Sequence, residues 1–103
     1  SSLNIDYGKL DYHFTAFIGI LLTKSNRTQE VLKELATIPN VIEASVISGK
    51  YNIFCKVKAK NTEDAKRIIY QIDDIQDVMR TESMISMQEY LSDKNRLIDA
   101  VSI

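Results

Sequence analysis

An internal repeat constrains the fold of this chain more than any other feature of its sequence. When the chain is shifted by 37 residues against itself, apolar positions coincide without a gap, from Phe17 on Phe54 to Val41 on Val78. A repeat that occurs only twice cannot build a solenoid, so the pattern indicates a duplicated domain. At 103 residues the two copies together make one domain with one modest hydrophobic core.

The first copy has the pattern of a strand, a helix and a second strand. Residues 15–23 are rich in the aromatic and β-branched residues that strands favour, and residues 41–48 form the second strand. Between them we expect a helix capped by Asn26 and ended by Pro39. One face of this helix carries the apolar residues Val31, Leu32, Leu35 and Ile38.

The second copy repeats this order after a tight hairpin at residues 48–50, where Gly49 can adopt a positive φ. A strand over residues 51–60 precedes a helix that begins at Asn61 or Thr62, and residues 78–88 form the last strand. The order β-α-β-β-α-β is that of ferredoxin-like α+β folds. We therefore predict a four-stranded antiparallel sheet with both helices on one face.

Strand alternation predicts what the other face of the sheet carries. In the third strand, Ile53 and Cys55 point toward the helices, while Phe54 points away from them. An apolar face of this size is not left in water, so we expect two copies to dimerise through it. The predicted dimer interface comprises Phe17, Leu21, Ile47, Phe54 and Met84.

Composition narrows the classes of function. The chain has 13 basic and 14 acidic residues, a net charge of −1, which argues against nucleic-acid binding by this segment alone. Its single cysteine excludes an internal disulfide and favours the reducing cytoplasm. No apolar run approaches the ~20 residues of a membrane helix, so no membrane partner is expected. Because Ser1 is not Met, two interpretations of the chain stay open: a piece of a longer protein or a free-standing domain.

No group of residues suggests catalysis, a metal site or a cofactor. His13 has no partners at metal-ligand spacing, and Cys55 alternates with apolar residues as a buried thiol does. We interpret the acidic group after the second helix, Asp73, Asp74 and Asp77, as a solvated turn. The basic residues of the third strand, Lys56, Lys58 and Lys60, are interpreted as solubilising surface charge. The chain is predicted not to be an enzyme.

Several segments resemble the effector domain of the leucine-responsive/asparagine-responsive (Lrp/AsnC) family of transcription regulators. They are residues 15–20 (TAFIGI), 38–44 (IPNVIEA), 48–57 (SGKYNIFCKV), 80–83 (RTES) and 94–97 (KNRL). The resemblance implies an effector domain that forms dimers and then octamers, with amino acids bound between dimers. It also implies that DNA is read by a helix-turn-helix that this chain does not contain. The implied organisation is a connecting segment (1–14), an effector and oligomerisation domain (15–91) and a C-terminal tail (92–103).

The resemblance also implies an effector site for an amino acid or a related metabolite. Backbone N–H groups and hydroxyls would bind the carboxylate of such a ligand, and an acceptor would bind its ammonium group. The family's hairpin often ends in Asp, whereas this chain has Asn52 there, which favours an alternative: an assembly module of the same fold without a ligand. The implied effector-binding residues are Gly49, Lys50, Tyr51, Asn52, Thr81 and Ser83.

Overall fold

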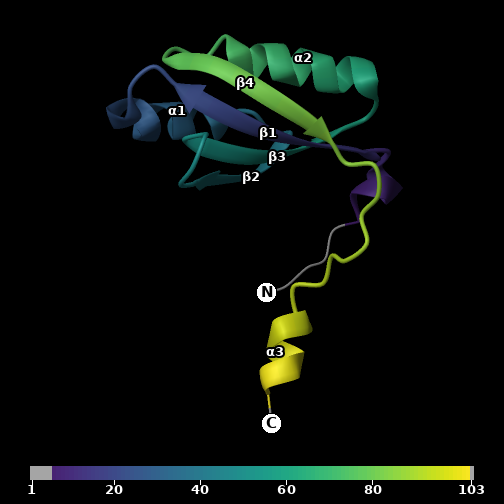
Figure 1. Cartoon of the computed structure of the whole chain (residues 1–103). Coiled ribbons are helices and arrows are strands. Elements are labelled where there is room, and N and C mark those ends of the chain that lie inside the picture. Colours follow the sequence, from purple (N-terminus) through teal and green to yellow (C-terminus); the bar gives the residue numbers. More distant parts are fainter. Residues whose placement is uncertain (1–5, 103) are drawn as a thin grey trace.

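The computed structural model describes residues 6–102, which contain a four-stranded antiparallel sheet with two helices on one face (Figure 1). The strand order is β2-β3-β1-β4, so the first strands of the two copies pair in the middle of the sheet. This architecture confirms the predicted ferredoxin-like α+β fold. In chain order, the elements are η1 (Tyr7–Leu10), β1 (Phe14–Leu22), η2 (Ser25–Arg27), α1 (Thr28–Leu35), β2 (Val41–Val46), β3 (Ile53–Ala59), α2 (Thr62–Asp73), β4 (Val78–Ile85) and α3 (Arg96–Val101).

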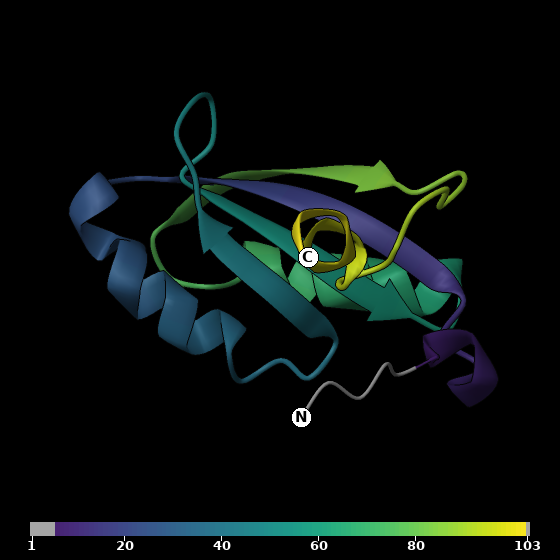
Figure 2. The same cartoon turned by 90° about the horizontal axis from the view of Figure 1, so that it is seen from below.

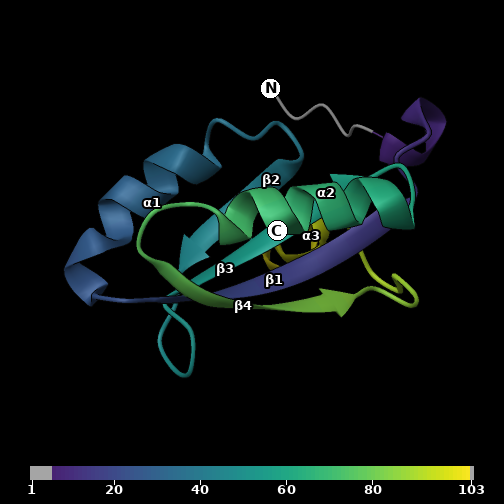
Figure 3. The ribbon, with the colours of Figure 1, turned by 90° about the horizontal axis from the view of Figure 1, so that it is seen from above.

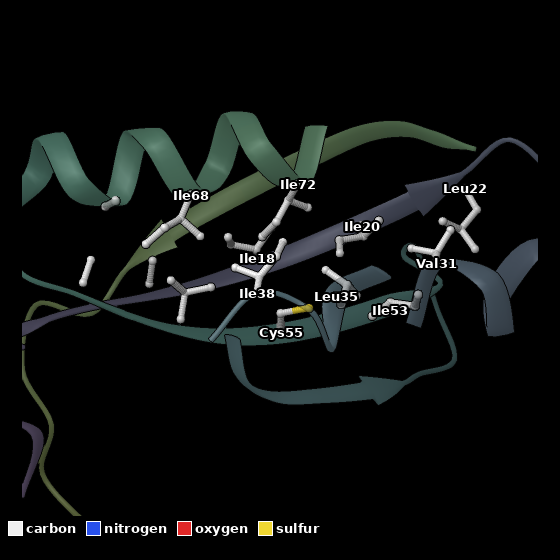
Figure 4. Packing of buried hydrophobic residues seen from close by; sticks show 14 residues of the cluster. Ile18, Ile20, Leu22, Val31, Leu35, Ile38, Ile53, Cys55, Ile68 and Ile72 are labelled. Carbon is white, nitrogen blue, oxygen red and sulfur yellow. The ribbon is translucent and has the colours of Figure 1, made fainter. Parts of the chain in front are cut away.

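The hydrophobic core lies between the sheet and the two long helices (Figure 4). Ile18 of β1 lies opposite Cys55 of β3, and both side chains are fully buried. Seen from above, α2 lies over this face of the sheet, and α1 runs along its edge beside β2 (Figure 3). Each fully buried aliphatic side chain contributes roughly 1.5–3 kcal/mol by leaving water. The helices add Val31, Leu35, Ile68 and Ile72 to the core.

The two helices begin differently, and one of the predicted caps is wrong. Asn26 does not cap α1, because it lies within the 3₁₀ turn η2, which is continued by a hydrogen bond from the Thr28 hydroxyl to the Ser25 carbonyl (2.6 Å). Asn61 does cap α2, since its side-chain oxygen accepts from the backbone N–H of Asp64 (2.8 Å). Because η2 occupies residues 25–27, α1 begins at Thr28, one residue later than a cap at Asn26 predicts.

The end of α1 also differs from the prediction. The helix ends at Leu35, before Pro39 is reached. Both the N–H (3.0 Å) and the hydroxyl (2.6 Å) of Thr37 donate to the Glu34 carbonyl, which tightens the last turn and replaces helical bonding. Pro39 therefore lies in the loop rather than at the end of the helix. Strands β2 and β4 are likewise shorter than predicted, ending at Val46 and Ile85.

Cys55 is buried, as predicted, and burial raises the pKa of its thiol to about 11. At neutral pH the thiol is therefore protonated, and the protonated form is a poor nucleophile. We expect Ellman's reagent to react with Cys55 slowly in the native protein and rapidly in denaturant. Stoichiometric reaction within seconds under native conditions would contradict this placement.

Within residues 6–102, none of the helices has the length and the apolar character that crossing a bilayer requires.

Candidate functional site

The face of the sheet opposite α1 and α2, seen in Figure 2 and called the open face below, carries an apolar centre. The rings of Phe17 and Phe54 are stacked there, with centroids 5.9 Å apart and an interplanar angle of 13°. Met84 lies directly opposite Phe17 on the neighbouring strand β4. Aromatic side chains in such an arrangement offer a large contact surface for another apolar face.

The structure places the predicted interface residues on or beside the open face. Phe17, Leu21 and Phe54 are half-buried, because neighbouring side chains cover part of their surface. Ile47, just beyond β2, and Met84 on β4 are 36% and 39% exposed. An apolar surface therefore extends over β1, β3 and β4 and to the end of β2.

Charged groups border this apolar surface near the end of β3. The amine of Lys56 lies 5.9 Å from the centroid of the Phe17 ring. It is also 3.7 Å from the Glu43 carboxylate and 3.8 Å from that of Glu89. Lys56 is thus part of a local charge network rather than an isolated solubilising charge.

The hairpin between β2 and β3 projects from the sheet (Figure 2), and Asn52 fastens its base to β1. The Asn52 N–H donates to the carbonyl of Ile20 (2.9 Å), and its side-chain oxygen accepts from the N–H of Leu22 (2.9 Å). At the tip, Gly49 has the predicted positive φ of 107°, and the space where its Cβ would stand is open. The tip is therefore accessible, whereas the Asn52 oxygen already has a donor within the chain.

Tyr51 holds the hairpin against the open face by lying directly over Gly19. A Cβ atom built on Gly19 would be only 2.8 Å from Cδ2 of the Tyr51 ring, so only glycine allows this approach. The Tyr51 hydroxyl is buried near Glu82 but has no hydrogen-bond partner among the described residues. Interaction with the Glu82 carboxylate, followed by burial, nevertheless raises the pKa of the Tyr51 phenol.

The sequence analysis did not identify Gly19, although the sequence contained a signal for it. A single glycine within an otherwise apolar strand often marks a close approach by other atoms. Here the atoms are those of Tyr51, a residue that the resemblance had assigned to the effector site.

Thr81 and Ser83 lie on the other side of the sheet from Tyr51. They are paired with Ile20 and Ile18, whose side chains face the helices. The Thr81 hydroxyl donates to the carboxylate of Asp73 at the end of α2 (2.6 Å). Within one chain, the six predicted effector-binding residues therefore do not converge on one cavity.

The acidic group after α2 is exposed at Asp73 and Asp74, as expected for a solvated turn, whereas Asp77 is half-buried and paired. Asp77 has a positive φ of 74°, and its carboxylate accepts from Nε of Arg27 (2.9 Å). Asp73 accepts from Thr81, as described above, and only Asp74 is exposed without such a contact in the described part of the chain. These aspartates fix the connections between the helices and the sheet. No cluster of potential metal ligands is found among residues 6–102.

Two hollows at opposite ends of the described structure lie away from the hairpin. One of about 550 Å³ lies between the ends of α1 and α2 and includes the Arg27–Asp77 pair. Another of about 230 Å³ lies at the opposite end of the sheet, where η1 approaches the start of β2. Neither is lined by any of the six predicted effector-binding residues.

The strand order and the hairpin anchored by Tyr51 define a ferredoxin-like domain with one helix-covered face and one open face. Residues 15–96 match the family described as the Lrp/AsnC ligand binding domain. The chain belongs to this family. Its relatives are transcription regulators, which confirms the resemblance stated from the sequence and the prediction that the chain is not an enzyme.

Individual relatives agree with this assignment. Regulatory protein AsnC of Haemophilus influenzae is 35% identical over 85 residues, which are 82% of this chain and 57% of that protein. The structure of Escherichia coli AsnC superposes with a TM-score of 0.84 at 26% identity, covering 90% of this chain and 63% of that one. The feast or famine regulatory protein Rv3291c of M. tuberculosis, complexed with L-methionine, has a TM-score of 0.80 at 19% identity with the same coverage of 90% and 63%. The chain thus spans about six tenths of the length of these relatives.

Proposed function

We propose that this domain senses an amino acid or a related metabolite and forms oligomers as part of an Lrp/AsnC-type transcription regulator. The observation that carries the proposal is the projecting hairpin, whose tip is accessible at Gly49 and whose base is fixed to β1. Membership of a ligand-binding family supports it. The structural neighbour Rv3291c was solved with L-methionine, which makes an amino acid the natural ligand class to test.

We further propose that the ligand binds between subunits. The hairpin residues project beyond the sheet, whereas Thr81 and Ser83 face the helices, so one site that uses both groups needs a second copy of the chain. The amine of Lys50, backbone N–H groups at the tip and the two hydroxyls are suitable donors for a carboxylate. The proposed site comprises Gly49, Lys50, Tyr51, Asn52, Thr81 and Ser83.

Assembly through the open face is the second part of the proposal. The stacked Phe17 and Phe54 rings, with Met84 beside them, form an apolar surface that a second sheet can cover. Such a dimer is the unit from which an octamer would be built. A ligand at a junction between dimers can shift assembly only if its affinity differs between two assembly states.

The proposal for the whole protein places DNA binding in a helix-turn-helix outside this sequence. The connecting segment 1–14, the effector and oligomerisation domain 15–91 and the tail 92–103 remain the proposed organisation. Residues 1–5 and 103 lie outside the described residues. The described part of the connecting segment contains η1 and leads into β1 at Phe14.

A thermal-shift screen against the twenty amino acids tests the sensing function. At about 100 times Kd, a ligand stabilises the folded protein by about 2.7 kcal/mol, so we expect at least one amino acid at millimolar concentration to raise Tm by several degrees. Lys50→Ala should reduce this rise, whereas Lys33→Ala on the exposed surface of α1 should not. If no amino acid changes Tm, the sensing function is wrong.

An assembly module without a ligand is the second candidate function. The observation that favours it is the hydrogen bond from the Leu22 N–H to the Asn52 oxygen, which engages the acceptor expected to bind an ammonium group. Size-exclusion chromatography with light scattering distinguishes the two functions. An oligomer whose mass is unchanged by every amino acid supports the assembly module.

A further inference from the structure

The hollow of about 230 Å³ at the far end of the sheet from the hairpin combines an apolar lining with one amine. Its volume suits a ligand smaller than the drug-sized molecules that occupy about 300–1,000 Å³. The 3₁₀ turn η1 lies beside the end of the sheet where β2 begins, and Figures 2 and 3 show this from both sides. The lining residues are Tyr7, Leu10, Tyr12, Pro39, Asn40, Ile42 and Lys58.

The backbone around this hollow is fixed on both sides. Asn40 accepts from the N–H of Lys58 and donates its side-chain amide to the Lys58 carbonyl, both at 2.9 Å. On the other side, the Tyr12 N–H donates to the Tyr7 carbonyl (2.9 Å), and Asp6 accepts from the N–H of Gly8 (3.0 Å). The shape of the hollow is therefore set by the fold before any ligand arrives.

Lys58 supplies a positive charge that has no carboxylate partner in the described part of the chain. Its amine donates to the Thr15 hydroxyl (2.6 Å) and lies 5.7 Å from the centroid of the Tyr7 ring. Lys56, on the same strand and the same face, has two carboxylates within 4 Å. A half-buried lysine whose amine has no carboxylate within 4 Å among the described residues retains capacity to bind an anion.

Lys58 also lines a second, polar hollow of about 280 Å³ on its other side. Its lining includes Thr15, His13, Ser86 and Glu89, and the Glu89 carboxylate lies 3.8 Å from the amine of Lys56. The amine thus stands at the boundary between an apolar and a polar environment. A molecule with an apolar body and a carboxylate group matches this division.

We propose that the hollow between η1 and the start of β2 binds a free small-molecule carboxylate with an aromatic or branched aliphatic body. The body packs among Tyr7, Leu10 and Ile42, and the carboxylate accepts from the amine of Lys58. This site is separate from the proposed effector site at the hairpin, which lies at the opposite end of the sheet.

Phenylacetate is the probe for the test, titrated into the ¹⁵N-labelled full chain as it assembles in solution. We expect amide shifts at Tyr7, Leu10, Asn40 and Lys58, with smaller or no shifts for the uncharged phenylacetamide and for acetate, which lacks the apolar body. Lys58→Gln should weaken phenylacetate binding by at least about tenfold, because a charge-assisted hydrogen bond is lost.

Lys56→Gln is the matched control and should leave the affinity for phenylacetate unchanged, since its amine already has carboxylate partners. If Lys58→Gln fails to fold, Leu10→Ser on the exposed turn η1 is the second variant, and it should weaken binding several-fold. The proposal is overturned if phenylacetate causes no shifts, or if Lys58→Gln binds it as the unmodified chain does. Shifts confined to residues 48–52 would also overturn it, because they would assign the anion to the hairpin.

Discussion

Phe17→Asp is expected to convert the assembled protein into folded monomers. The Phe17 ring stacks on Phe54 at the centre of the open face, so a partner sheet would bury the new carboxylate away from water. An uncompensated buried charge costs several kcal/mol, which weakens association by about a thousandfold or more. Sedimentation equilibrium should then show the mass of a single chain over the micromolar range.

The monomeric variant should keep its fold, because Phe17 points away from the core. In the single subunit this face is in contact with water, so the new carboxylate stays solvated there. Circular dichroism should therefore report unchanged helix and strand content. A variant that unfolds instead would show that Phe17 serves the single subunit rather than the assembly.

Tyr70→Asp is the matched control for this experiment. It makes the same change from an aromatic residue to aspartate, but Tyr70 is 57% exposed and lies on α2, on the opposite side of the sheet from the open face. The sheet-to-sheet dimer should survive in this variant. If Phe17→Asp keeps the mass of the unmodified protein, or if the unmodified protein is already monomeric at high concentration, assembly through the open face is wrong.

The sequence predicted the fold class and the two faces of the sheet because both follow from periodicity. In a strand, neighbouring side chains alternate between faces, so the helix-facing position of Ile18 places Phe17 on the open face. Because the repeat aligns Phe54 with Phe17, it places Phe54 on the open face as well. Two periodic patterns, one for strands and one for helices, were sufficient for the order of the elements along the chain and for the two faces of the sheet.

Features that depend on contacts between distant segments were not predictable in this way. Asn26 has the side chain of a good cap, but the turn before α1 is held by the pairing of Arg27 with Asp77, a residue far along the chain. Local preference was overridden here by tertiary contacts.

The candidate effector site was predicted from resemblance, which gives residues but not their arrangement in one subunit. Strand alternation alone would have placed Thr81 on the same face as Ile20, away from the open face. The role of Asn52 in fastening the hairpin depends on the Leu22 N–H, which the sequence does not bring near it. The proposed site between copies of the chain rests on this separation of the two groups within one subunit.

Gly19→Ala tests the contact that holds the hairpin on the open face. The added Cβ would be 2.8 Å from the Tyr51 ring, so the ring and the hairpin must move. Overpacking of this kind costs about 1–3 kcal/mol, and we expect the free energy of unfolding to fall by that amount in a urea titration. Amide shifts should be largest at residues 48–52.

The same substitution should change sign when the Tyr51 ring is absent. In a Tyr51→Ala background, the Cβ added by Gly19→Ala meets no ring, and replacing glycine within a strand then stabilises the chain by about 0.4–1 kcal/mol through the unfolded state. The double-mutant cycle thus isolates the contact between Gly19 and Tyr51 from the general effect of glycine. Equal effects of Gly19→Ala in both backgrounds would show that Tyr51 does not require glycine beneath it. The hairpin would then be positioned by Asn52 alone.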